Sequence, residues 1–84
     1  MSLNWLAEQA ALMGYRDIVN DMINHGVDVY NRIAYNAAWG GHRDIVGDMI
    51  NRGANNYSGI TQSTVEGGYR DIVEDMIDIG SDIY

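Results

Sequence analysis

A segment of 17 residues occurs three times in this chain, each time 27 residues after the previous copy. The first copy begins at Gly14, and the three copies read GYRDIVNDMINHGVDVY, GHRDIVGDMINRGANNY and GYRDIVEDMIDIGSDIY. The copies are identical at ten positions: Gly, Arg-Asp-Ile-Val, Asp-Met-Ile, Gly and Tyr. Similarity at a fixed period predicts a repeat architecture, in which each copy buries its apolar face against the next one.

The period extends upstream of the repeated segment, since Asn4, Asn31 and Ser58 share one phase. We therefore expect one repeat domain over residues 1–84. Its units would be 4–30, 31–57 and 58–84. A domain of this size buries only about 60–65% of the surface that its unfolded chain exposes, so its core must be small and efficient.

Each unit is predicted to contain two short helices. The first begins after Asn4, Asn31 or Ser58, residue types that cap helix N-termini through a side-chain oxygen. Its apolar residues follow an i, i+1, i+4, i+5 pattern, which forms one face of a helix. They are Leu6, Ala7, Ala10 and Ala11 in the first unit, Ile33, Ala34, Ala37 and Ala38 in the second, and Ile60, Thr61, Thr64 and Val65 in the third.

The second helix of each unit begins near the glycine that opens the repeated segment. It is expected to end at Gly26, Gly53 or Gly80, because glycine readily adopts the left-handed conformation that ends helices. Its buried stripe is predicted to be Ile18, Val19, Met22 and Ile23, with Ile45, Val46, Met49 and Ile50 and then Ile72, Val73, Met76 and Ile77 as the equivalents.

Charged residues flank this stripe. At about 100° per residue, Arg16 lies at one edge of the helix and Asp21 at the other. In a head-to-tail stack the arginine edge of one unit should face the aspartate edge of its neighbour. Two sets of inter-repeat ion pairs satisfy this condition: Arg43 with Asp21 and Arg70 with Asp48, or Arg16 with Asp48 and Arg43 with Asp75. The alternative is six solvated charges that make no contact.

The segment AAWGGHRDIVGDMINRGAN at 37–55 resembles the core of the ankyrin repeat, in which Ala-Ala, Gly-His, an Ile-Val-type pair and a Gly-Ala/Asp-Asn loop follow in that order. The other copies fit the same frame, the third more loosely. Ankyrin units are about 33 residues long, and the shortfall falls where that family forms its β-hairpin. The family's Thr-Pro-Leu-His start is also absent. The resemblance implies an all-α fold, an α-solenoid of three stacked helix-turn-helix, ankyrin-like repeats that lack the β-hairpin.

No pattern indicates an enzyme, a cofactor or a metal site. The chain has no Cys, and its acidic clusters lack the alternating ligands and glycine of a calcium loop. His42 shares its position with Tyr15 and Tyr69, which favours packing over metal binding, and His25 is expected near the end of a helix. We therefore expect no catalytic residues.

The charge and hydropathy of the chain favour neither nucleic acid nor a membrane as a partner. A net charge of −7 disfavours binding to nucleic acid. No apolar run is long enough to span a membrane, and the N-terminus lacks the pattern of a signal peptide, so we expect a soluble protein that is not exported.

The outward stripe of the first helix differs most among the units. It comprises Trp5, Glu8, Gln9 and Leu12, then Arg32, Tyr35, Asn36 and Trp39, then Gly59, Gln62, Ser63 and Glu66. Trp, Tyr and Arg are frequent anchors in protein interfaces. The resemblance implies a non-enzymatic scaffold for protein–protein interaction, and the candidate partner-binding face is Trp5, Arg32, Tyr35, Asn36 and Trp39. Sequence drift at unconstrained surface positions is the alternative explanation.

A second interpretation of function is a structural or self-assembling module. Neither end unit is a polar cap, and Ile79 and Ile83 add apolar surface to the last unit. Uncapped ends of repeat proteins tend to associate, which would give a homo-oligomer. A fragment of a longer array and an engineered minimal repeat protein without a natural partner are further alternatives.

Overall fold

The computed structural model describes residues 2–80, which form six α-helices. They are α1 (Leu3–Met13), α2 (Arg16–Asn24), α3 (Tyr30–Gly40), α4 (Arg43–Arg52), α5 (Tyr57–Gly67) and α6 (Arg70–Ile79). No strand occurs between residues 2 and 80, which confirms the prediction of an all-α protein with two helices in each unit. Ile83, predicted to add apolar surface, lies outside the described residues.

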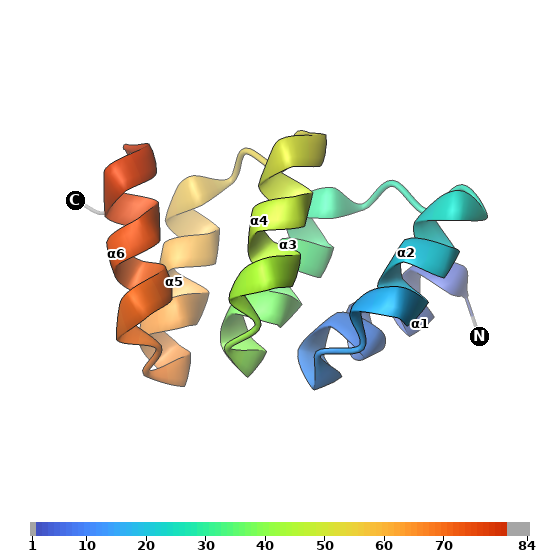
Figure 1. Ribbon diagram of the computed structural model, residues 1–84, viewed down its shortest axis with the longest axis horizontal. Helices are drawn as coiled ribbons and strands as arrows, with labels where there is room; N and C mark the ends of the chain where they lie inside the picture. Colours follow the sequence, from blue (N-terminus) through green and yellow to red (C-terminus); the bar gives the residue numbers. More distant parts are fainter. Residues whose placement is uncertain (1, 81–84) are drawn as a thin grey trace.

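The helices form two layers (Figure 1). α1, α3 and α5 lie side by side in one layer, and α2, α4 and α6 lie in front of them. The α1–α2 and α5–α6 pairs stand at opposite ends of the longest axis, which measures 35 Å. α1 packs on α3 and α3 on α5, whereas α2, α4 and α6 approach one another less closely.

Alanine explains the close packing of the first helices. Ala7 and Ala11 on α1 and Ala34, Ala37 and Ala38 on α3 are completely buried. A side chain of one methyl group allows two helix backbones to approach closely while leaving no void between them. The spacing of these alanines therefore sets the distance between adjacent helix pairs.

In α5, threonine takes the place of alanine. Thr61 and Thr64 are buried, and their hydroxyls donate hydrogen bonds to the carbonyls of Tyr57 and Ile60 at 2.7 Å each. Burying a hydroxyl is costly only when it lacks a partner. The third unit can therefore use polar residues at core positions.

The predicted N-caps are wrong, because each first helix begins two residues earlier than expected. Ser2 and Asn56 cap α1 and α5 by accepting hydrogen bonds from backbone N–H groups. Asn31 lies inside α3, and its Oδ1 accepts from the backbone N–H groups of Asn55 and Asn56 at 2.8 and 3.0 Å. The residue expected to cap a helix instead ties the loop after α4 to α3.

The predicted buried stripes are confirmed in part in every unit and are wrong at single positions in the first and last units. Ile45 and Ile72 are buried as expected, whereas the equivalent Ile18 is exposed. Ile77 and Val65, in the last helix pair, are also exposed. The stripe is buried only where a neighbouring helix pair covers it, and one copy of the pattern does not reveal whether that neighbour is present.

The predicted glycine stops are confirmed. Gly26, Gly53 and Gly80 have positive φ after the second helices, and Gly41, with a φ of 81°, ends α3 in the same conformation. A side chain at Gly41 would also overlap the ring of Tyr69, which lies directly against this glycine. Gly41 thus combines a helix stop with a contact between adjacent helix pairs.

We predict opposite effects for two glycine substitutions. Gly41→Ala should lower the free energy of unfolding by at least about 1–2 kcal/mol, because an L-residue is strained in the left-handed conformation and the Tyr69 ring must move. Gly47→Ala, the control, lies in the exposed middle of α4 with open space around it, and should raise the same quantity by about 0.5–1 kcal/mol. Urea titrations followed by circular dichroism measure both. A Gly41→Ala variant as stable as the parent would contradict the predicted strain.

Candidate functional site

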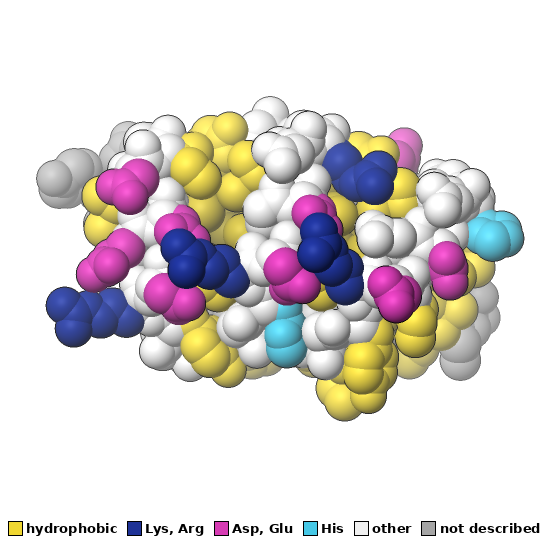
Figure 2. Space-filling view, in the orientation of Figure 1, with side chains coloured by type: hydrophobic (Ala, Val, Ile, Leu, Met, Phe, Trp, Pro, Cys, Tyr) yellow, Lys and Arg dark blue, Asp and Glu magenta, His cyan; other side chains and the backbone are white. Residues whose placement is uncertain are grey.

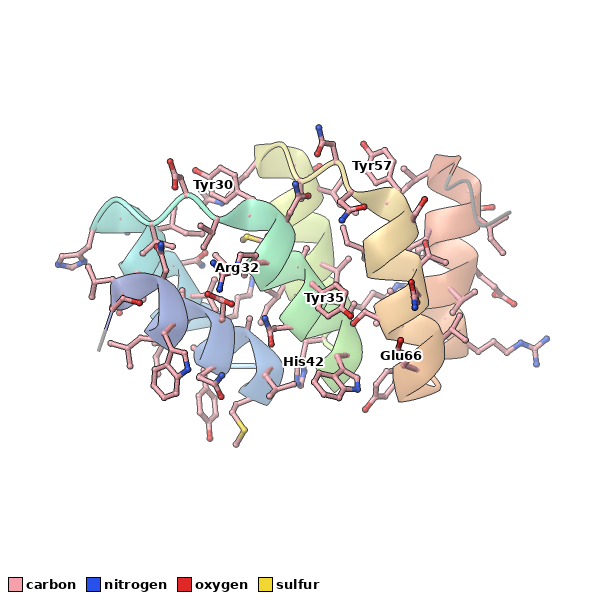
Figure 3. All side chains as sticks on the ribbon, turned by 180° about the vertical axis from the view of Figure 1, so that it is seen from behind. Tyr30, Arg32, Tyr35, His42, Tyr57 and Glu66 are labelled. Carbon is pink, nitrogen blue, oxygen red and sulfur yellow. The ribbon has the colours of Figure 1, made fainter. Side chains whose placement is uncertain are left out.

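A shallow pocket of about 330 Å³ opens beside α3, on the face formed by the first helices. Its lining residues are Glu8, Asn31, Arg32, Tyr35, Asn36, Trp39 and Asn56. Four of the five predicted binding residues are among them, all on α3; Figure 3 labels Arg32 and Tyr35 on this helix. Trp5, on α1, is half exposed and does not line the pocket.

The prediction that Glu8 faces outward is wrong. Glu8 was assigned to the outward stripe, but it is only 9% exposed because α3 packs across α1 at this point. Its Oε1 accepts a hydrogen bond from Arg32 Nε at 3.2 Å, and Arg32 Nη2 lies 3.1 Å from the same oxygen. Its Oε2 is buried and has no hydrogen-bond partner.

An unpaired buried carboxylate oxygen reduces stability. Leaving a buried acceptor without a donor costs about 1–3 kcal/mol, and more for a charged group. Native proteins rarely keep such an atom unless it serves a purpose. An incoming N–H or ammonium group placed at Oε2 would remove this cost.

Two aromatic side chains line the same pocket as the Glu8 carboxylate. Tyr35 and Trp39 stand four residues apart on α3, so their side chains share one face of the helix. Trp39 is half exposed and Tyr35 somewhat less. Exposed aromatic rings next to a carboxylate can hold the apolar stem and the charged head of a cationic side chain at the same time.

Ser63 is the second residue wrongly assigned to the outward stripe. It is buried on α5, and its hydroxyl donates to the carbonyl of Tyr35 at 2.8 Å. The side of α3 that faces α5 is therefore packed against that helix and is not part of the outward face. The outward face of the first helices is therefore narrower than the sequence indicated.

A band of alternating positive and negative side chains crosses α2, α4 and α6 (Figure 2). Arg16 Nε and Nη2 donate to Asp48 at 2.7 and 2.8 Å, and the same atoms of Arg43 donate to Asp75 at 2.6 and 2.7 Å. This arrangement is the second of the two considered from the sequence. Both contacts are bidentate, the geometry that gives the strongest guanidinium–carboxylate bonds.

The aspartates raise the pKa of both arginines. For Arg16 and for Arg43 the hydrogen bond to the aspartate is the largest cause, followed by its negative charge. A raised pKa extends the charged form of arginine to even higher pH. Both arginines are therefore positively charged across the whole physiological range.

Asp21 and Arg70 stand outside this band. Arg70 Nε lies 3.4 Å from Glu74 Oε1 in its own helix, and Asp21 makes no ion pair with any residue from 2 to 80. By the observed register, Asp21 would need an arginine one unit earlier, and Arg70 an aspartate one unit later. Neither position falls within residues 1–84.

The two histidines bind backbone carbonyls. His42 Nε2 donates to Leu12 O at 2.9 Å while its ring lies against Gly14 and Gly40. His25 Nδ1 donates to Asp21 O at 2.7 Å. In the part of the chain that is described, His, Asp and Glu nowhere form a group of three that could hold a metal ion.

Comparisons with protein-family models, with curated proteins and with solved structures find no match to this chain. None of the helices between residues 2 and 80 is long and apolar enough to cross a membrane. Arguments about function therefore depend on the geometry of the chain itself.

We predict a measurable coupling between Arg43 and Asp75. A double-mutant cycle with Arg43→Ala and Asp75→Ala should give a larger coupling free energy than the Arg70–Glu74 pair, because the contact is bidentate. The Arg70–Glu74 pair, within one helix, serves as the control and should give less than about 0.5 kcal/mol. Coupling that is equal in the two cycles, or absent from the first, would show that the bidentate geometry adds nothing to stability.

We also predict that Glu8 is not needed for folding. Glu8→Met should leave the free energy of unfolding unchanged or raise it by up to about 1 kcal/mol, because a side chain of similar size replaces a carboxylate with an unpaired oxygen. Arg32 is mostly exposed and stays solvated after the change. Thermal and urea unfolding provide the measurement. A loss of more than about 1 kcal/mol would mean that the carboxylate stabilises the fold.

Proposed function

We propose that the chain is a non-enzymatic scaffold that binds a protein partner through the pocket beside α3. The 27-residue repeat and its ankyrin-like core support a solenoid of three stacked units, an architecture that presents extended binding surfaces. Fold-level likeness alone is a weak argument for function. The observation that carries the proposal is the buried, unpaired Glu8 Oε2 in a pocket that is also lined by the exposed rings of Tyr35 and Trp39.

The chemistry of the pocket favours a lysine or arginine side chain of the partner. The ammonium or guanidinium group would donate to Glu8 Oε2, and the hydrocarbon stem would lie along Tyr35 and Trp39. Arg32 already neutralises part of the carboxylate, but its mostly exposed side chain can turn towards solvent. A net charge of −7 adds long-range attraction for a basic segment.

The size of the pocket limits what it can hold. A volume of about 330 Å³ is at the lower end for ligand sites and suits one or two side chains rather than a whole small molecule. The pocket therefore supports recognition of a short segment of a protein, with additional contacts on the exposed surface around it.

Selection from a displayed library of random-sequence peptides tests the proposal. Peptides enriched on the immobilised chain should share a lysine or arginine. Trp39→Ala and Glu8→Gln should weaken a selected peptide at least tenfold in fluorescence anisotropy, because each removes one side of the pocket. Trp5→Ala is the matched control, since it removes a half-exposed tryptophan outside the pocket, and should leave the affinity unchanged.

Two results would overturn the proposal. One is an affinity that is equal for the parent chain and for Glu8→Gln, because the unpaired oxygen would then have no part in binding. The other is a sharp fall in the melting temperature of Trp39→Ala, which would show that Trp39 supports the fold. Circular dichroism of each variant distinguishes loss of binding from loss of structure.

A further inference from the structure

We propose that copies of this chain associate head to tail, with the α5–α6 pair of one copy against the α1–α2 pair of the next. The register is the one that continues the 27-residue period from one chain into the next. This inference is independent of the pocket beside α3, because it concerns the two ends of the molecule.

The first end exposes apolar surface that is buried elsewhere in the chain. Ile18 is 45% exposed, whereas the equivalent Ile45 and Ile72 are 0% and 1% exposed. The local sequence Arg-Asp-Ile-Val is identical at all three places. Only the presence of a preceding helix pair differs, so that pair must supply the cover.

The opposite end, formed by α5 and α6, also exposes apolar side chains that are buried at the equivalent positions of earlier units. Val65 is 61% exposed, whereas Ala11 and Ala38 at the same position of the repeat are fully buried. Ile77 is also exposed, although the equivalent Ile50 packs against the core. A following helix pair would cover Val65 and Ile77, as α3–α4 and α5–α6 cover the pairs that precede them.

Aromatic rings that pack on glycines of the preceding helix pair also lack a partner at the two ends of the molecule. The ring of His42 covers Gly14, and the ring of Tyr69 covers Gly41. At the ends, Tyr15 is about half exposed, and among residues 2–80 no atom beyond the chain neighbours of Gly68 lies within 4 Å of the place where a Cβ at Gly68 would be. In the proposed register, Tyr15 of the second copy would cover Gly68 of the first.

The arginine–aspartate pairs predict the same head-to-tail register, independently of the apolar contacts. Each bidentate ion pair between adjacent helix pairs joins an arginine to an aspartate 32 residues later. Three periods of 27 residues make 81, so Asp21 of the next copy would take place 102 in a continuous count, which is 32 residues beyond Arg70. Arg70 and Asp21, which have no inter-pair ion-pair partner among residues 2–80, would pair with each other between two copies.

The two ends are different surfaces, so the contact is heterologous. A heterologous contact that does not close into a ring continues into an open row of copies. Association should therefore increase the mass progressively with concentration, without stopping at a dimer.

Sedimentation equilibrium on the full chain, across a dilution series from millimolar to micromolar, tests the inference with charge reversals. The parent chain should show a mean mass that rises with concentration. Asp21→Arg and Arg70→Asp should each weaken association at least tenfold, because like charges then meet at the contact. An equimolar mixture of the two variants should regain it, since each end then faces an opposite charge, and so should the double variant Asp21→Arg/Arg70→Asp.

Asp28→Arg is the matched control. It changes the net charge as Asp21→Arg does, but it lies in the exposed loop between α2 and α3, and should leave association unchanged. A parent chain that stays monomeric at millimolar concentration overturns the inference. Charge reversals without effect, a mixture that does not recover, or a control that weakens association equally would each overturn the proposed register. Circular dichroism verifies that every variant is folded.

Discussion

Burial of one helix pair against the next is the interaction on which this structure depends. Side chains that are fully buried in the second and third pairs, such as Ile45 and Ile72, repeat a pattern that leaves Ile18 exposed in the first pair. A pair of ten-residue helices has too little interior of its own to offset the entropy of folding. The core is therefore shared between pairs, and each contact between pairs repeats the previous one.

Apolar burial is not directional, so polar contacts fix how adjacent pairs align. The bidentate bonds of Arg16 with Asp48 and of Arg43 with Asp75 bridge the wider gaps between α2, α4 and α6. In the layer of the first helices, where the packing is closer, Asn31 on α3 accepts hydrogen bonds from the loop between α4 and α5. Each exposed ion pair adds little free energy, but a shift of one unit by a single helical turn would break all of these contacts together.

The proposed binding pocket is a consequence of the same packing. Alanines bring α1 and α3 so close that Glu8, a residue of the outward stripe, is covered by its neighbour while Tyr35 and Trp39 remain exposed. A buried carboxylate oxygen without a donor reduces stability, whereas α2, α4 and α6 bear carboxylates that are paired or solvated. The face formed by the first helices therefore has the chemistry to recognise a partner, and the face formed by the second helices has the chemistry to align the pairs.

The sequence by itself determined the period, the two helices in each unit and the glycines that end them, because these depend on residues close together in the chain. It also left open two arrangements of arginine–aspartate contacts and, as a third possibility, charges that make no contact. Only the tertiary structure decided between them, since the choice depends on the direction in which the next pair is added. The burial of Glu8, the exposure of Ile18 and the use of Asn31 to hold a loop depend on which neighbour covers each residue. No pattern within a single unit contains that information.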